Sequence, residues 1–321
     1  MKVAFVGAGK YARTHMDRFA AIEDVELAGV TSRTLATAEE AAAPHGMRAY
    51  ETAEEMIDAA EPDALVICVI PAAHGAPERL AVERGIPFLV EKPVGLDLEA
   101  AQHIAREVQA KGLVTAVGYQ WRYLDLVERA RELIDKSPVL LAQGYWLSRK
   151  PGAAWWHDPS LSGGQIVEQA THMADLLRVF LGDPEQVYGV FSAPGTDSRV
   201  PAASAATLRF PGGVPGTLIC ACALPVRYRN GFVVHTEQQV VELVSTASGM
   251  ENVRMTVRTA DGDETAAPAM DPVLAQDRAF VAAVRASDPQ GVRCDYADAV
   301  RTLRVSLAAA QSAQSGEAVR F

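Results

Sequence analysis

Short, continuous apolar runs alternate with segments of helical spacing in the first 120 residues. The apolar runs lie at 2–6, 25–30, 64–70, 87–90 and 114–118. The helical segments lie at 13–22, 34–45, 54–60, 74–85 and 98–111. Continuous apolar runs indicate strands that are buried on both faces, and helices between such strands act as right-handed crossovers. The pattern therefore predicts a doubly wound α/β domain with a parallel sheet over residues 1–120.

From residue 121 the pattern changes to consecutive strands with turn signals between them. The predicted strands are 139–147, 187–193, 204–210, 216–223, 231–236, 239–245 and 252–259. The predicted helices are 124–134, 165–181, 272–286 and 296–315. This order is typical of an α+β domain with a large, mostly antiparallel open sheet, which we expect over residues 121–321. So few helices leave one sheet face bare, which predicts a homodimer or homotetramer formed through it.

Composition and charge limit the kinds of molecule that the protein is expected to bind. Of 321 residues, 49% are hydrophobic and 22% are charged, values that indicate a globular protein with a sizeable core and about two domains. The formal net charge of -10 argues against nucleic acid or an anionic membrane surface, because both would repel the protein. A small-molecule ligand is the expected partner.

The cysteines and the start of the chain suggest a compartment. The four cysteines form no C-x-x-C motif, which favours buried thiols in a reducing environment. No basic, cleavable segment precedes the first strand, and no run of about 18 apolar residues occurs. We therefore expect a cytoplasmic protein with no membrane-spanning segment.

The first chemical motif is Gly7-x-Gly9-x-x-Ala12, which follows the first strand directly and opens a helix. The first glycine permits a tight turn, the second leaves room for a pyrophosphate, and the small alanine lets helix and strand lie close. The helix N-terminus then offers N–H groups to phosphates. Although such glycines also occur in ordinary turns, the strand and helix around them favour a dinucleotide site.

The end of the second strand bears on which dinucleotide is bound. An acidic residue that would bind the ribose hydroxyls of NAD is absent there, and the chain has Thr31-Ser32-Arg33-Thr34 instead. A guanidinium and hydroxyls suit a 2′-phosphate, so NADP(H) is preferred and NAD(H) remains possible. The alternative is that Ser32 only caps the next helix and Arg33 is a solvated surface charge.

The second motif is Glu91-Lys92-Pro93, at the carboxyl end of a buried strand, where doubly wound sheets bind ligands. A lysine there can exchange a proton with a substrate hydroxyl. The alternative is a salt bridge between Glu91 and Lys92. Pro93 is a candidate for a cis peptide bond.

The third motif is a Gly163-Gly164 turn that opens a helix carrying Glu168 and His172. Their spacing of four places both on one helix face, so the carboxylate can orient and charge the imidazole as an acid or base. Asp175 could hold the same ring instead, and a surface ion pair is the plainer alternative. No further histidine or cysteine cluster adjoins, so we expect no metal.

Together with Gly118-Tyr119-Gln120-x-Arg122 and Ser312-Ala313-x-Ser315-Gly316, these motifs resemble the Gfo/Idh/MocA oxidoreductase family along the whole chain. The resemblance implies a Rossmann domain, a C-terminal sheet domain, and NAD(P)-dependent oxidation or reduction of a sugar, polyol or related compound. It implies Lys92 and His172 as the proton-transfer pair, with Glu168 as a third catalytic residue where many relatives have Asp.

Further site residues follow from the matched positions. The residues expected at the cofactor are Gly7, Gly9, Lys10, Tyr11, Ala12, Ser32, Arg33, Thr34, Pro71, His74, Glu91, Lys92 and Gln120. Those expected at the substrate are Lys92, Arg122, Trp155, Glu168 and His172. Trp155 belongs to a set, with Trp146, Arg149, Lys150, Trp156 and His157, that could stack on a sugar and bond its hydroxyls. Alternatively, these tryptophans fill the core or a subunit interface.

Two rival functions use the same fold. One is a sensor or regulator that binds dinucleotide without redox chemistry, although such a protein has no need of Lys92 and His172. The other is a glycosidase with tightly held NAD, against which Ser32 and Arg33 argue.

Overall fold

The computed structural model describes residues 1–195 and 197–321, and the chain divides into two compact units. Unit 1 comprises Met1–Gln120 and Val273–Val300, and unit 2 comprises Trp121–Pro272 and Arg301–Phe321. The sequence placed all of 121–321 in the second domain. The structure instead packs 273–300 with unit 1, because Phe280 and Val281 join its hydrophobic core.

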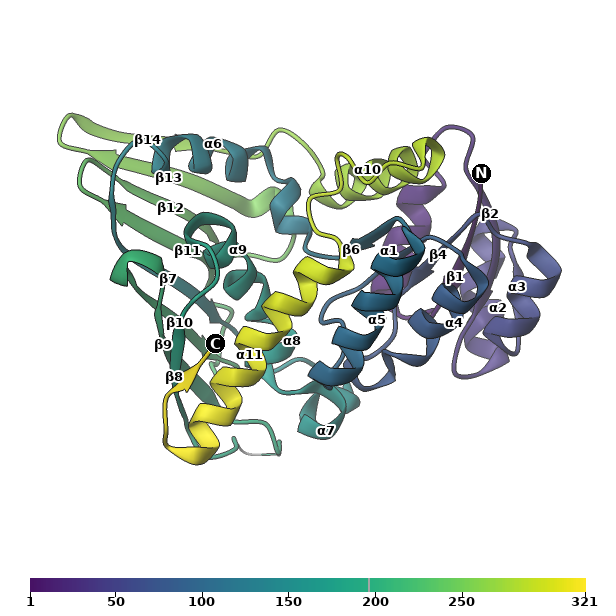
Figure 1. Cartoon of the computed structure of the whole chain (residues 1–321), viewed down its shortest axis with the longest axis horizontal. Helices are drawn as coiled ribbons and strands as arrows, with labels where there is room; N and C mark the ends of the chain where they lie inside the picture. Colours follow the sequence, from purple (N-terminus) through teal and green to yellow (C-terminus); the bar gives the residue numbers. More distant parts are fainter. Residues whose placement is uncertain (196) are drawn as a thin grey trace. The chain divides into compact units, whose positions relative to one another are not determined.

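Unit 1 is a parallel sheet with the strand order β3-β2-β1-β4-β5-β6. Figure 1 labels β1, β2, β4 and β6 of this sheet together with helices α1 to α5. Its strands are β1 (Lys2–Val6), β2 (Glu26–Thr31), β3 (Arg48–Tyr50), β4 (Ala64–Ile67), β5 (Phe88–Val90) and β6 (Thr115–Val117). Its helices are α1 (Lys10–Phe19), α2 (Leu35–Ala42), α3 (Ala53–Ala60), α4 (Ala76–Arg84), α5 (Leu98–Lys111) and α10 (Pro272–Ala286), whose first residue belongs to unit 2. This is the expected doubly wound sheet.

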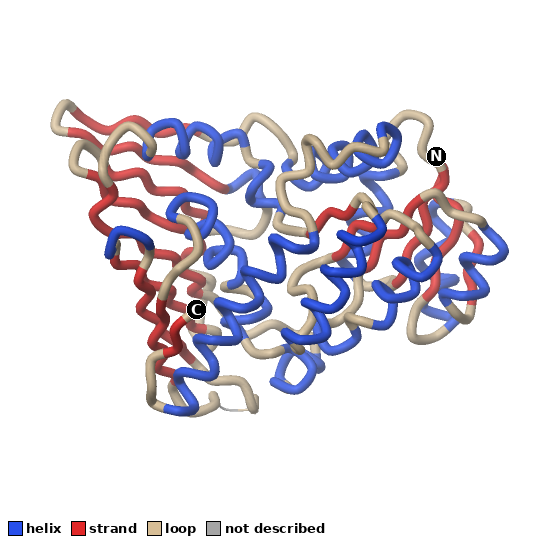
Figure 2. Tube along the Cα trace, in the orientation of Figure 1, coloured by secondary structure: helices blue, strands red, loops and turns tan. Residues whose placement is uncertain are grey.

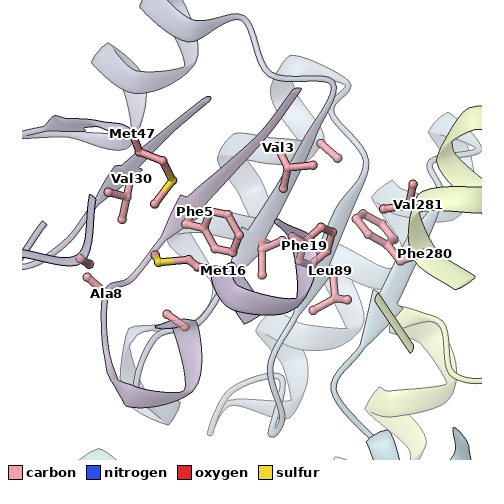
Figure 3. Close-up of a cluster of buried hydrophobic side chains, with 14 of the residues drawn as sticks. Val3, Phe5, Ala8, Met16, Phe19, Val30, Met47, Leu89, Phe280 and Val281 are labelled. Carbon is pink, nitrogen blue, oxygen red and sulfur yellow. The ribbon is translucent and has the colours of Figure 1, made fainter. Parts of the chain in front are cut away.

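The core of unit 1 joins helix and strand side chains that are distant in sequence (Figure 3). Phe5 from β1 packs edge to face with Phe19 from α1, with ring centroids 5.9 Å apart. The buried face of α1 consists of Ala12, His15, Met16 and Phe19. This helix starts three residues earlier than expected, and its buried face includes a histidine among apolar side chains.

Unit 2 is a nine-stranded sheet with the order β14-β13-β12-β11-β7-β10-β9-β8-β15. Its strands are β7 (Val139–Leu147), β8 (Gln186–Phe191), β9 (Ala203–Arg209), β10 (Pro215–Ala221), β11 (Arg229–Thr236), β12 (Val240–Ser245), β13 (Val253–Thr259), β14 (Gly262–Ala266) and β15 (Val319–Arg320). Its helices are α6 (Asp125–Ile134), α7 (Pro159–Ser162), α8 (Gln165–Glu168), α9 (Thr171–Leu181) and most of α11 (Tyr296–Ser315). Within the described strands β7 and β10 are the one parallel pair, so the mostly antiparallel sheet is confirmed.

Among the described residues, the helices that pack on this sheet lie on one of its faces (Figure 2). Helix α9 packs on β7, β10 and β11, and α6 packs on β12. On the other face a row of side chains crosses three neighbouring strands, with Val190 opposite Ala205 and Ala205 opposite Ile219. Val190 and Ile219 are 58% and 41% exposed, so this open face carries an uncharged, apolar row.

Three further features of the described residues concern the thiols, membrane spans and metal ions. All four cysteines are free thiols; Cys220, Cys222 and Cys294 are buried, and Cys68 is half-buried. No described helix is long and apolar enough to cross a membrane. Within residues 1–195 and 197–321, no three His, Cys, Asp or Glu residues are arranged to hold a metal ion.

Candidate active site

The glycine turn after β1 has the geometry of a phosphate cradle. Gly7 has φ of 109°, and a Cβ on it would collide with the backbone carbonyl of Cys68 after β4. A Cβ on Gly9 would meet nothing within 4 Å, so this residue borders open space. Gly9 is also the N-cap of α1 and makes no side-chain cap. The turn therefore offers backbone N–H groups toward a space in which a pyrophosphate fits.

The strand order places this turn where a ligand binds. Chain connectivity runs outward from β1 through β2 to β3 on one side, and from β4 through β5 to β6 on the other. Ligands of doubly wound sheets bind at the carboxyl ends of the strands where the order reverses, here between β1 and β4. Gly7, at the end of β1, lies at this point.

The residues after β2 decide between the two interpretations of the Thr31–Thr34 segment only in part. Thr34 is the N-cap of α2, and its hydroxyl accepts a hydrogen bond from the Thr37 amide. Ser32 is therefore not the helix cap that the alternative interpretation required. Arg33 is exposed, and no ion pair joins it to another described residue. Its guanidinium is available to a ligand.

The remaining residues predicted at the cofactor have diverse environments. Lys10 and Tyr11 are exposed on the first turn of α1. Pro71 opens a short 3-10 helix after β4 and is buried. The side chain of His74 is fully buried and bonds Glu78 through Nδ1 at 2.5 Å. Among the described residues, His74 Nε2 and Gln120 Oε1 are buried without a hydrogen-bond partner.

Lys92 follows β5 directly, so it lies at the carboxyl edge of the sheet, and it is half-buried. The Lys92–Pro93 peptide bond is cis. The preceding residue, Glu91, is buried, and its carboxylate bonds His15 and the Lys92 amide. Glu91 thus faces inward and serves as a support beneath Lys92.

Two residues of this support were missed from the sequence. His15 on α1 bonds both carboxylate oxygens of Asp277 on α10 at 2.9 Å. Its position on α1, three residues after Ala12 and one before Met16, is a core position occupied by a polar side chain, and this was the available signal. Asp277 is 262 residues away in the chain and has no comparable signal.

The predicted helix over 165–181 is two helices, which changes the interpretation of Glu168 and His172. Helix α8 ends at Glu168 and α9 begins at Thr171. At the junction the Ala170 amide donates a hydrogen bond to the Gln165 carbonyl. The His172 amide donates a hydrogen bond to the Gln169 carbonyl. The i,i+4 argument for one continuous helix is therefore wrong, since a regular α-helix would bond the His172 amide to Glu168.

Each of the two side chains contacts a tryptophan of unit 2. Glu168 accepts a hydrogen bond from Trp156 Nε1 at 2.9 Å. His172 is 4% exposed, and its ring stacks on Trp146 of β7 with centroids 5.7 Å apart and planes at 22°. Packing against a rigid indole restricts the orientation of the imidazole.

Asp175 supports Arg122 and not the ring of His172. Its carboxylate accepts from Arg122 Nε at 2.7 Å and Nη2 at 2.5 Å, and from the Thr302 hydroxyl at 2.9 Å. Both members of this bidentate ion pair are buried. Arg122 therefore ties residues 120–123 to α9, and its contact with a substrate stays a prediction.

Of the tryptophans before α8, one fills the core and the other keeps an exposed surface. Trp156 is 1% exposed and packs with Val200 and Cys222, as a core residue does. Trp155 is half-buried against the same cluster and retains exposed surface. Of the two, Trp155 has a face available to a ligand.

Comparison with known proteins identifies the class. The model of the oxidoreductase family with an NAD-binding Rossmann fold, GFO/IDH/MocA, matches residues 1–119. The model of the GFO/IDH/MocA C-terminal domain matches residues 127–242. The chain belongs to the Gfo/Idh/MocA oxidoreductase family.

Individual relatives are dehydrogenases. The chain is 30% identical over 198 residues to UDP-N-acetylglucosamine 3-dehydrogenase of Acidithiobacillus ferrooxidans, covering 61% of this chain and 60% of that protein. It is 28% identical over 179 residues to D-xylose 1-dehydrogenase (NADP(+)) 2 of Haloferax volcanii, covering 54% of each. The match thus spans little more than half of these relatives. The structure of GenD2 from gentamicin A biosynthesis, in complex with NAD, has TM-score 0.87 and 23% identity, and covers 100% of this chain and 96% of that one.

Proposed function

We propose that this protein is an NADP(H)-preferring dehydrogenase or reductase that acts on a hydroxyl-bearing or keto carbon of a sugar, polyol or related compound. When bound, the nicotinamide would accept or supply the hydride. The observation that carries the proposal is Lys92, a half-buried residue at the carboxyl edge of the sheet that bears the Gly7 turn. Dehydrogenase relatives and the family membership support it.

The proposal assigns cofactor-binding, proton-transfer and substrate-binding roles to individual residues. Gly7, Gly9 and the N-terminus of α1 would hold the pyrophosphate. In the oxidation direction Lys92 takes the hydroxyl proton as the carbon loses hydride, and His172, from unit 2, assists this transfer. Glu168, held by its hydrogen bond from Trp156, would bind hydroxyl groups of the substrate. Trp155 would stack on a face of the sugar. The pairing of Lys92 with His172 is part of the proposal.

Turnover tests the proposal directly. Nicotinamide absorbance is followed with NADP and with NAD across sugars, polyols, inositols and their keto forms. Turnover with one compound class supports a dehydrogenase and names its substrate. Tight NADPH binding without turnover on any compound would favour a sensor, and copurifying cofactor that is never consumed would favour a glycosidase.

Arg33 provides a separate test of the cofactor preference. We expect Arg33→Ala to raise the KM for NADP about 10–100-fold and to leave that for NAD nearly unchanged, because only the 2′-phosphate loses a charge-assisted bond. The control is Arg48→Ala, which removes an equal charge from β3, where Arg48 lies over the Tyr50 ring. Equal changes in the two KM values would contradict the NADP preference.

We also propose that the open face of unit 2 pairs with a second copy of the chain. The row Val190, Ala205 and Ile219 is apolar and uncharged, as the centre of a symmetric interface requires. Analytical ultracentrifugation at micromolar concentration should show a dimer or tetramer. The Ile219→Arg substitution should shift the oligomeric state toward the monomer. Val226→Arg, at a 58% exposed loop position, is the control. A wild-type monomer would refute the proposal.

A further inference from the structure

A three-member ionic cluster lies inside unit 1, beneath the Glu91-Lys92-Pro93 turn. His15 Nδ1 is 2.9 Å from both carboxylate oxygens of Asp277, and His15 Nε2 is 3.2 Å from Glu91 Oε1. The side chains of His15 and Asp277 are fully buried, and that of Glu91 is 9% exposed. The cluster connects three elements: α1, the end of β5, and α10.

The charges of the cluster depend on the histidine. Burial alone would lower the pKa of His15, but the adjacent Asp277 carboxylate and hydrogen bonds to Asp277 and Glu91 raise it to about 10. The imidazole is therefore a cation at neutral pH and separates two buried carboxylates. Without this cation the carboxylates would repel each other or one would take up a proton, so the histidine determines whether Glu91 keeps its place.

The Glu91 carboxylate has little room to move. Oε2 accepts a hydrogen bond from the Lys92 amide at 3.3 Å, while Oε1 faces His15. Gly118 also adjoins the carboxylate, since an added Cβ on it would collide with Glu91 Oε1. Glu91 thus occupies a slot that exists because residue 118 lacks a side chain, and one of its oxygens holds the backbone of Lys92.

We propose that His15 and Asp277 are positioning residues for Lys92: they fix Glu91, and Glu91 fixes the backbone from which the Lys92 amine projects. The inference rests on the proposed function of Lys92. A displacement of about 1 Å at a reacting group can cost on the order of a hundredfold in rate, so a support of this kind acts on turnover without touching substrate.

The cluster also links a late segment of the chain, α10, to its first helix. Asp277 lies on α10, and Phe280 and Val281 of the same helix pack into the core of unit 1. Asp277 is therefore held by apolar packing within one turn of its own position. The part of the chain that returns to unit 1 thus supplies one end of the support for Lys92.

The test compares His15→Gln and Asp277→Asn with the parent enzyme. Glutamine has its donors on a single nitrogen and carries no charge, so it cannot reproduce the two opposed ring nitrogens of His15, whereas asparagine leaves His15 a hydrogen-bond partner. In His15→Gln we expect turnover per folded enzyme to fall about 10–100-fold with NADPH affinity kept, and in Asp277→Asn to fall less. The control is His103→Gln, which breaks an exposed i,i+4 pair with Glu107 in α5 and should change nothing.

A second readout does not need turnover. Acylation of the Lys92 amine by a small reagent, measured by peptide mass spectrometry, should be about threefold or more faster in His15→Gln, because a loosened turn exposes the amine. Lys136, exposed after α6, is the internal reference. A role that only stabilises the fold would lower the melting temperature and leave both the turnover of folded enzyme and the acylation rate unchanged.

The outcomes separate this inference from the function on which it rests. Unchanged turnover and acylation in His15→Gln would overturn the positioning role, while loss of turnover in Lys92→Met would still uphold the dehydrogenase. Full turnover in Lys92→Met would instead refute the proposed function, and the acylation rate would then report the positioning alone. If His15→Gln does not fold, Asp277→Asn provides the same comparison.

Discussion

Replacing Lys92 by methionine should lower turnover by about two to four orders of magnitude, the range expected when a general acid or base is lost. Methionine keeps much of the length and the apolar stem but removes the amine. Because the phosphate cradle is formed by Gly7, Gly9 and α1, the affinity for NADPH should change only a few-fold. Steady-state rates and fluorescence titration with NADPH measure the two quantities.

Lys136→Met is the matched control, since it makes the same replacement at an exposed position in unit 2. A loss of turnover that equals the loss of NADPH affinity would mean that Lys92 holds the cofactor and does not move a proton. Turnover that stays unchanged in Lys92→Met would exclude the mechanism. A rate that falls mainly in kcat, with KM preserved, is the result that supports it.

The sheet of unit 1 was predictable because burial on both faces produces continuous apolar runs. Ala64–Ile67 is buried at every position, and so are Phe88–Val90 and Thr115–Val117. The strand Arg48–Tyr50 has one buried residue in three, and Gly262–Ala266 has none. These two strands are defined by backbone pairing with a neighbour, which leaves no hydrophobic pattern to read.

The active-site motifs were predictable, whereas their supports were not. Glycine spacing and Glu91-Lys92-Pro93 are local in sequence, and their positions follow from the strands that precede them. The partners of Glu91 and Glu168 come from elsewhere: His15 is 76 residues from Glu91, and Trp156 is 12 residues from Glu168. The break between α8 and α9 falls at Gln169 and Ala170, neither of which is a helix-breaking residue.

Buried polar groups recur behind the candidate site residues in each unit. In unit 1 an imidazolium lies between two carboxylates behind Lys92, and in unit 2 the Arg122 and Asp175 pair anchors α9, the helix that carries His172. Such groups gain little net stability over apolar packing, but removing one partner is costly. They fix side-chain geometry, which an acid/base site needs more than it needs extra stability.

Unit 1 should lose stability as the pH rises from about 6.5 to 8.5. The pKa of His15 is about 10 in the folded chain against 6.5 when exposed, so the folded state binds the proton more tightly. The resulting stabilisation is complete below pH 6.5 and is lost as the pH approaches 10. Between pH 6.5 and 8.5 the unfolding free energy should fall by about 2–3 kcal/mol, since one pKa unit corresponds to about 1.4 kcal/mol.

Comparing the wild type with His15→Gln isolates the contribution of His15. Circular dichroism monitors urea unfolding of both proteins at pH 6.5, 7.5 and 8.5. Besides Asp277 and Glu91, the ionisable groups acting in this cluster are Tyr11, Cys68 and Arg18. The pKa values of Tyr11 and Cys68 are raised above their usual range, so neither group ionises within this window. The difference in unfolding free energy between the two proteins should therefore shrink as pH rises. Parallel pH profiles would mean that His15 is neutral in the folded protein and that the two carboxylates are not held by a cation.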